Sequence, residues 1–266
     1  MSRLLVCPPD YFCIDYEINP WMRRSNAADS RRACAQWHAL MRGLEQEIGV
    51  LLERMQPVQG LPDMVFTANA GSIMGRRAVP SRFRHPERQR EEAYFEAWFR
   101  LHHYDVILLE PGLYFEGAGD LLGFPDVWFG GYRQRSDIRA YAQLSEIFER
   151  QIIPLELVDP RFYHLDTCFC PLSGGELLYY PPAFDAYAQA VIADRISAER
   201  RLIVPEADAL RFSCNAVCVG KHVVLPEGCG ETGHLLVSRG YEPHHLPLDE
   251  FMKAGGSAKC LTLALD

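Results

Sequence analysis

The residues best able to do chemistry stand where apolar segments of the chain are interrupted. They are a thiol, an imidazole, an amide and several carboxylates: Cys260, His164, Asn69, Asp63, Glu116, Asp120 and Asp166. A thiol that shares a site with an imidazole can act as a covalent nucleophile, because a neighbouring base promotes the reactive thiolate. Gly255, Gly256 and Ser257 precede the cysteine, so the backbone there can approach a ligand closely. The sequence therefore predicts a nucleophile site if the fold brings these residues together.

Short segments in which apolar residues are followed by small ones recur five times, about fifty residues apart. They are centred on Phe66, Phe115, His164, Cys214 and Cys260. A helical pattern fills each interval and a strand-like run follows it, and units of this size bury their sheets by closing into a ring. The repeat predicts an α/β fold of five modules around a central site, within a single domain over residues 1–266. The first strand, at residues 4–7, is expected to complete the last module.

The expected helices can be placed from their apolar spacing. They cover residues 30–55, 86–102, 136–148, 184–196 and 231–239. Ser136 and Asp137 suit an N-cap, and Pro86 suits a first helical turn. Strand-like runs follow at residues 106–109, 152–158, 202–204 and 246–248. Each module should therefore contain several strands and one helix.

Composition and charge narrow the function classes. With 27 basic against 35 acidic residues, the chain lacks the positive excess that binds phosphate backbones, so a small molecule is a better partner than nucleic acid. No apolar run reaches the roughly 18 residues of a membrane span, and the apolar start is too short for a secretion signal. Nine cysteines in a chain of this length indicate free thiols in a reducing cytoplasm.

The sequence gives no reason to expect a metal or a cofactor. It contains no Cys-x-x-Cys pair and no Gly-rich phosphate loop ending in Gly-Lys-Ser/Thr. The histidine pairs 102–103 and 244–245 are adjacent in sequence, so their side chains point in different directions. Both pairs are expected at the surface.

Four motifs cover almost the whole chain in a fixed order. They are Asp63–Asn69 (DMVFTAN), Phe115–Asp120 (FEGAGD), His164–Asp166 (HLD) and Gly255–Cys260 (GGSAKC). Together they resemble the guanidine-modifying superfamily, which comprises arginine deiminases, dimethylarginine dimethylaminohydrolases, amidinotransferases and arginine dihydrolases. Residues 7–12 and 18–22 resemble the arginine dihydrolases most closely. The resemblance implies a pentein fold, a pseudo-fivefold α/β propeller with a central active site, in agreement with the repeat.

The resemblance also implies a mechanism without a cofactor. Cys260 would attack the central carbon of a guanidinium, and His164 would protonate the departing amine and then activate water. Glu116 would orient His164, and Asp166 would face the same side of a strand as His164 and contact the guanidinium. The implied substrate-binding residues are Asn69, Asp166, Arg88, Arg135, Asn19 and Asp63.

Arg88 and Arg135 are implied to bind the α-carboxylate of a free amino acid, a task that suits the bidentate guanidinium fork. Each has another arginine two residues away, Arg90 and Arg133, so the assignment could slip by two positions.

Asn69 departs from the aspartate that deiminases and dimethylarginine hydrolases carry at this position. An amide has both a donor and an acceptor, so it could hold a guanidinium or, after turning, a ureido group. The dihydrolases carry this asparagine, which implies a hydrolase that converts arginine to ornithine, carbon dioxide and two ammonia. A deiminase or dimethylarginine hydrolase giving citrulline, an amidinotransferase, and an arginine-binding protein without turnover are the alternatives. A homo-oligomer is left open.

Overall fold

Strands of two to five residues form five three-stranded sheets within residues 2–265, the part of the chain that the structure, a computed structural model, describes. The sheets are β15-β1-β2 (Leu263–Ala264, Arg3–Val6, Leu51–Arg54), β3-β4-β5 (Gly71–Met74, Arg77–Pro80, Asp105–Val106), β6-β7-β8 (Leu121–Gly123, Trp128–Tyr132, Ile152–Glu156), β9-β10-β11 (Phe169–Pro171, Leu177–Tyr179, Arg201–Ile203) and β12-β13-β14 (Val217–Val219, His222–Pro226, Glu242–Leu246). In every sheet the middle strand pairs antiparallel with the first strand and parallel with the third. The predicted α/β fold of five modules is confirmed.

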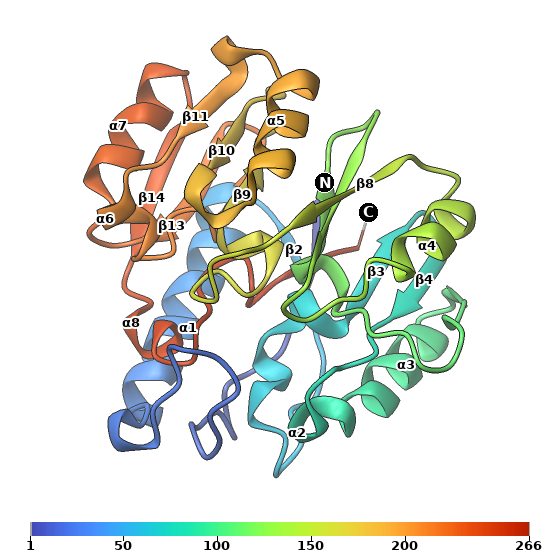
Figure 1. Ribbon diagram of the computed structural model, residues 1–266. Coiled ribbons are helices and arrows are strands. Elements are labelled where there is room, and N and C mark those ends of the chain that lie inside the picture. Colours follow the sequence, from blue (N-terminus) through green and yellow to red (C-terminus); the bar gives the residue numbers. More distant parts are fainter. Residues whose placement is uncertain (1, 266) are drawn as a thin grey trace.

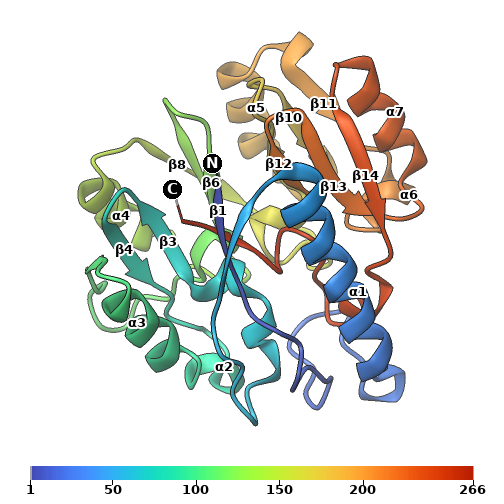
Figure 2. The same cartoon turned by 180° about the vertical axis from the view of Figure 1, so that it is seen from behind.

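The two ends of the chain share one module. Strand β15, near the C-terminus, pairs with β1 near the N-terminus, with Leu5 opposite Leu263. Strand β1 then pairs in parallel with β2. The prediction that the first strand completes the last module is therefore confirmed. Both termini lie close together in Figure 1 and in the reverse view of Figure 2.

One main helix connects the two parallel strands of each module, because a parallel pair needs a crossover. These helices are α1 (Ser30–Arg42), α3 (Glu92–Leu101), α4 (Ala140–Phe148), α5 (Ala186–Arg195) and α7 (Gly230–Ser238). Three four-residue helices add to them: α2 (Pro86–Gln89), α6 (Glu206–Ala209) and α8 (Asp249–Met252). The helices lie at the periphery and the sheets lie further in (Figures 1 and 2).

The long helix predicted over residues 30–55 is wrong in its second half. Asp29 caps α1 by accepting from the N–H groups of Arg31 and Arg32, and the α-helix ends at Arg42. A π-helical turn, Gly43–Ile48, follows, and Gly49 ends it in the left-handed region with φ of 82°. The residues after it join β1 as strand β2, so sheet pairing overrides the helical spacing.

Two other helix starts differ from the predictions. The pattern over residues 86–102 is divided into α2 and α3, and the break turns Arg88 and Glu91 into the interior. Ser136 does not cap α4, since its hydroxyl donates to Asp120 instead (2.6 Å). Interior polar contacts therefore decide both boundaries.

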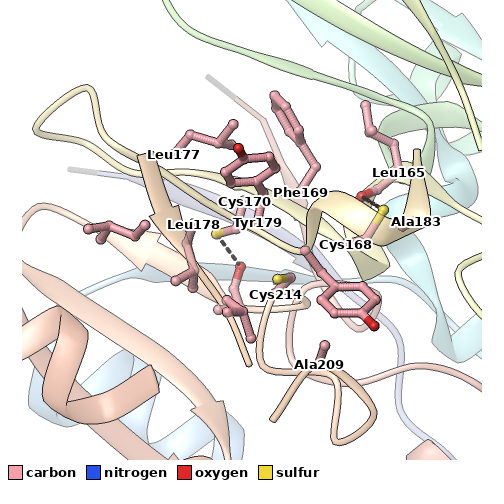
Figure 3. Close-up of a cluster of buried hydrophobic side chains, with 14 of the residues drawn as sticks. Leu165, Cys168, Phe169, Cys170, Leu177, Leu178, Tyr179, Ala183, Ala209 and Cys214 are labelled. Carbon is pink, nitrogen blue, oxygen red and sulfur yellow. Dashed lines mark hydrogen bonds between the residues drawn. The ribbon is translucent and has the colours of Figure 1, made fainter. Parts of the chain in front are cut away.

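The largest buried cluster is centred on the β9-β10-β11 sheet and helix α5, and it extends to β7 and β8 on one side and to β13 and α7 on the other; Figure 3 shows part of it. It includes Cys168, Cys170 and Cys214, which pack as small apolar side chains among aromatic and aliphatic residues. All nine cysteines fall within residues 2–265, and each is a free thiol there. No helix in this described part combines the length and apolar character needed to cross a membrane.

Candidate active site

Short turns before the first strand of three modules hold, or directly follow, four of the predicted site residues. The turns are Thr67–Ala70 before β3, Gly117–Gly119 before β6 and Leu165–Thr167 before β9. Asn69 and Asp166 lie within such turns, and Glu116 and His164 immediately precede them. Asp166 was expected on a strand face beside His164, but it lies in a turn, where its side chain points toward Cys260 (3.3 Å between Oδ2 and Sγ).

Glu116 and His164 form one half of the site. His164 Nε2 lies 2.8 Å from Glu116 Oε2, and Arg135 Nη1 donates to the same oxygen at 2.8 Å. Burial alone would raise the pKa of Glu116, but Arg135 and His164 outweigh it and hold the pKa well below its usual range. Glu116 therefore stays ionised, so it can orient His164 and stabilise a positive charge on the ring. The Asn69 amide joins this half by donating to the Glu116 backbone carbonyl (2.9 Å).

Cys260 and Asp166 form the other half, and Asn215 holds them together. The Asn215 amide group lies 3.1 Å from both Cys260 Sγ and the Asp166 backbone carbonyl. Its oxygen accepts from the Cys260 backbone N–H (3.1 Å), and the Cys260 carbonyl accepts from the N–H of Ala68 (3.1 Å). Because Ala68 precedes Asn69 in the same turn, these contacts close a circuit of hydrogen bonds through all five modules.

The Cys260 thiol is held in its protonated form. Burial and the neighbouring Asp166 carboxylate raise the pKa of Cys260 well above its ordinary value. Burial also raises the pKa of Asp166 to about 6, against the opposing positive charge of Lys259. A cation bound between the thiol and the carboxylate would favour the thiolate, so the site suits a cationic substrate.

Two buried carboxylate oxygens in this region have no hydrogen-bond partner among the described residues. They are Asp63 Oδ1 and Asp166 Oδ1. Buried carboxylates are normally satisfied by N–H donors or cations. A guanidinium, which presents several N–H donors and a positive charge, matches what both oxygens can accept.

Arg88 fixes the orientation of Asn69. Its Nη1 donates to the Asn69 side-chain oxygen (2.9 Å), and its Nε and Nη2 donate to Glu91 (3.0 and 2.8 Å). Nη2 also donates to the Asp63 backbone carbonyl (3.2 Å). Burial raises the pKa of Glu91 to about 7, although Arg88 opposes this. Turning the Asn69 amide would break its bonds to Arg88 and to the Glu116 carbonyl.

Burial distinguishes the two predicted arginines from the arginines two residues away from them. Arg88 and Arg135 are both 3% exposed, whereas Arg90 and Arg133 are exposed. Both inward arginines already have protein partners. Arg135 binds Glu116 and the Ile18 carbonyl (3.1 Å) and lies over the Tyr163 ring at 4.6 Å.

Asn19 belongs to an N-terminal loop that contacts the site region. Its amide donates to the Ala254 carbonyl (3.0 Å), and its oxygen accepts from the N–H groups of Trp21 and Met22 (2.9 and 3.2 Å). Trp21 in turn donates to the Arg161 carbonyl (2.7 Å). Asn19 therefore shapes the loop beside Ala254, at the start of the Gly-Gly segment that precedes Cys260.

Gly119 allows the halves of the site to approach each other. A Cβ atom built there would lie 2.4 Å from Asn69 Nδ2 and 3.4 Å from His164 Nδ1. No larger residue fits without displacing Asn69, so the second glycine of the FEGAGD motif is required beside the site.

The structure adds three residues that the sequence argument missed. Asn215 stands at the fourth repeat segment, and that position was the available signal. Lys259 precedes Cys260 and acts on the pKa of Asp166. Glu91 had no signal beyond its spacing of three from Arg88.

Asp120, a candidate from the sequence, supports the scaffold. It accepts hydrogen bonds from Ser136 and from the N–H of Leu165 (3.0 Å).

Similar proteins share this architecture across nearly the whole chain. No family model matches the chain. The bifunctional arginine dihydrolase/ornithine cyclodeaminase ArgZ of Synechocystis is 46% identical over 265 residues, which is 98% of this chain and 37% of that protein. The N(G),N(G)-dimethylarginine dimethylaminohydrolase of Mycobacterium tuberculosis is 39% identical over 99% of this chain and 85% of that enzyme. The chain thus spans little more than a third of ArgZ and most of the length of the dimethylarginine enzyme.

Solved structures agree with the sequence comparison. A substrate-bound cysteine-to-serine variant of the N-terminal domain of ArgZ, described as an arginine dihydrolase, superposes with a TM-score of 0.96 at 45% identity. The match covers 100% of this chain and 98% of that one. A dimethylarginine dimethylaminohydrolase adduct with S-methyl-L-thiocitrulline has a TM-score of 0.82 at 20% identity, a likeness of fold.

Proposed function

Because the chain belongs to the guanidine-modifying superfamily, we propose that it hydrolyses the guanidinium group of arginine twice, giving ornithine, carbon dioxide and two ammonia. Residues 1–266 act as one catalytic domain in this proposal. Cys260 is the nucleophile, His164 the acid and base, and Glu116 the carboxylate that positions His164. No cofactor takes part.

The first step begins when the substrate cation lies against Asp166 and Asp63. Its charge favours the Cys260 thiolate, so the thiol releases its proton to solvent and the thiolate attacks the central guanidinium carbon. His164 donates a proton to the nitrogen that leaves as ammonia, and a covalent thiouronium remains on Cys260. His164 then removes a proton from a water molecule that attacks the same carbon, and the ureido product is released from sulfur.

The observation that carries the two-step proposal is the amide of Asn69 and its two partners. Arg88 is a pure donor and the Glu116 carbonyl a pure acceptor, so together they define which end of the amide is oxygen. Each end keeps one further hydrogen-bonding position. Asn69 can therefore accept from a guanidinium or donate to a ureido oxygen without turning.

A retained ureido group permits a second attack by Cys260. Hydrolysis of its remaining carbon–nitrogen bonds releases ornithine, carbon dioxide and the second ammonia. Over both steps arginine consumes two waters. Asp166, Asp63, Asn69 and Asn19 line the substrate site in this proposal, while Arg88 and Arg135 border it and attract the α-carboxylate.

A substrate panel tests the proposal. Purified protein is incubated separately with arginine, methylarginine, dimethylarginine, citrulline and agmatine. The products are identified by mass spectrometry. We expect arginine to be consumed fastest and to yield ornithine. Preferred turnover of dimethylarginine would instead indicate a dimethylarginine hydrolase, and guanidinoacetate formed after glycine is added would indicate amidino transfer. Inertness toward every compound would overturn the assignment.

The compartment and the assembly are part of the same proposal. The nine free thiols fit a reducing cytoplasm. The partner is a small guanidinium compound, and a homo-oligomer is left open.

A further inference from the structure

A group of two histidines and a glutamate lies on strands β13 and β14 of the β12-β13-β14 sheet, outside the segments that hold Cys260 and His164. His222 begins β13 and is paired in register with Glu242 of the parallel strand β14. His244 follows two residues after Glu242, so both point to the same side of the sheet. One ligand atom from each of the three side chains lies within 4.8 Å of the others.

Two of the three separations within this group are close to those between ligands of one metal ion. His222 Nδ1 is 3.0 Å from His244 Nε2 and 3.2 Å from Glu242 Oε2. Ligands at the zinc distance of about 2.0–2.1 Å, arranged tetrahedrally, lie about 3.3 Å apart. We propose that His222, Glu242 and His244 bind a divalent transition-metal ion of the zinc class, with the remaining position open to water.

A second carboxylate lies behind one of the proposed ligands. Glu47, in the π-helical turn that follows α1, places Oε2 3.8 Å from His244 Nδ1, the ring nitrogen that faces away from the group. Histidines that bind metals commonly have a carboxylate at their other nitrogen, which orients the ring. At 3.8 Å this is an ion-pair contact without a hydrogen bond, so Glu47 lies beside the ring and would act as such an outer partner by moving closer.

Other contacts leave the ligand atoms accessible. Lys221 holds Glu242 through Oε1 (2.5 Å), so Oε2 remains directed toward His222. The side chains of His222 and His244 are 25% and 26% exposed, so an ion can enter from solvent. Without a metal, the two ring nitrogens 3.0 Å apart need one proton between them.

The adjacent residue His245 takes no part. Its Nδ1 lies 3.3 Å from the Pro226 carbonyl, and its ring packs near Gly233 of α7. The expectation that residues 244 and 245 point in different directions is therefore correct. His222, the partner of His244, lies on the neighbouring strand β13. A search for ligands that are close together in the sequence therefore does not find this group.

The position of the site suggests its effect. Helix α1, which connects β1 to β2, lies along β13 and β14 in Figure 2, and Glu47 comes from the turn at its end. A bound ion would join β13 to β14 and, through Glu47, connect the β12-β13-β14 module to the β15-β1-β2 module. Metal binding should therefore stabilise the fold by mass action and leave the chemistry at Cys260 to its own residues.

Zinc and cobalt(II) binding to the tag-free protein tests the site. Calorimetry with zinc chloride should show one ion per chain, and the melting temperature should rise with zinc. His222→Gln and His244→Gln should each weaken this binding by more than about a hundredfold, and Glu47→Gln by about ten- to a hundredfold. His234→Gln, a change at an exposed histidine of α7, is the matched control and should bind like the unchanged protein.

The cobalt(II) spectrum distinguishes this site from the nine thiols. Nitrogen and oxygen ligands give visible bands without the strong near-ultraviolet charge-transfer band of a thiolate. Equal zinc affinity of the unchanged protein and His222→Gln would overturn the proposal. So would a thiolate band that accounts for all of the bound metal, or a protein that binds no zinc.

Discussion

In the proposed reaction, the choice between one hydrolysis and two depends on Asn69. Replacing it by aspartate removes the donor that faces the Glu116 carbonyl and places a negative charge beside a developing ureido oxygen. We expect Asn69→Asp to shift the products from ornithine toward citrulline, measured by chromatography of arginine reactions. Asn26→Asp, at an exposed turn, is the control and should leave the product ratio unchanged. Unchanged ornithine formation by Asn69→Asp would contradict this role.

Glu116 should affect turnover more than substrate affinity, because it acts through His164. Glu116→Gln keeps the shape of the side chain but removes the negative charge that both Arg135 and His164 contact. We expect kcat to fall by about a hundredfold to ten-thousandfold, with a smaller change in KM. Glu156→Gln removes a carboxylate of similar type from an ion pair with the exposed Arg133 and should retain activity. Equal losses in both variants would count against a special role for Glu116.

Lys259 should control the acid side of the pH profile. Burial raises the pKa of Asp166 to about 6, and the positive charge of Lys259 limits this rise. Since binding of a guanidinium needs the ionised carboxylate, kcat/KM should fall as the pH drops through about 6. Lys259→Met removes the cation, so the pKa of Asp166 rises further and the acid limb should move to higher pH. An unchanged limb would be inconsistent with this coupling, and Lys221→Met, at an exposed lysine, serves as control.

The sequence predicted which residues belong to the candidate site better than it predicted their contacts. Cys260, His164, Glu116 and Asn69 could be named because they interrupt apolar repeat segments in a recognisable order. Their contacts could not be predicted, because Asn215 and Glu91 act through hydrogen bonds between distant segments. The roles of the predicted residues in binding and catalysis stay predictions until variants are measured.

At the scale of elements, short turns position the site, and Gly119 shows how little space they leave. A Cβ atom there would lie 2.4 Å from the Asn69 amide nitrogen. Gly119→Ala should therefore displace Asn69 and lower kcat/KM by about a hundredfold, while circular dichroism shows an intact fold. Gly230→Ala is the control, because no atom lies within 4 Å of the added carbon. Normal activity of Gly119→Ala would show that the turn tolerates the shift.

The elements themselves were predictable where apolar spacing acts alone. Helices α5 and α7 begin and end within about two residues of the predicted limits. The helix predicted over residues 30–55 fails because β1 recruits residues 51–54 into a sheet. The N-cap predicted at Ser136 fails because Asp120, from another segment, binds its hydroxyl. A local spacing of apolar residues contains no information about contacts with distant segments. Helix boundaries that depend on such contacts therefore cannot be predicted from it.

At the scale of the whole molecule, closure of the ring depends on a two-residue strand near the C-terminus. Leu263 of β15 is 1% exposed and is paired with Leu5. Leu263→Ala should lower the free energy of unfolding by about 2–5 kcal/mol, measured by urea denaturation. Leu101→Ala, at a leucine that is 74% exposed, should change it by less than about 0.5 kcal/mol. Similar small effects in both variants would mean that β15 contributes little to closure.

The period of about fifty residues made the five-module fold predictable, because a repeat constrains every module at once. The circuit of hydrogen bonds that joins the modules was not predictable, since it depends on backbone groups of Ala68 and Cys260 that carry no sequence signal. The same holds for His222 and His244, which meet only through the register of parallel strands.

Two successive hydrolyses of arginine at one site, as proposed here, would give products in a ratio that a single hydrolysis cannot give. Purified protein is incubated with arginine, and ornithine, citrulline and ammonia are quantified over time. We expect two ammonia for each ornithine, without accumulation of citrulline. Citrulline as the sole amino-acid product, with one ammonia for each molecule, would contradict it.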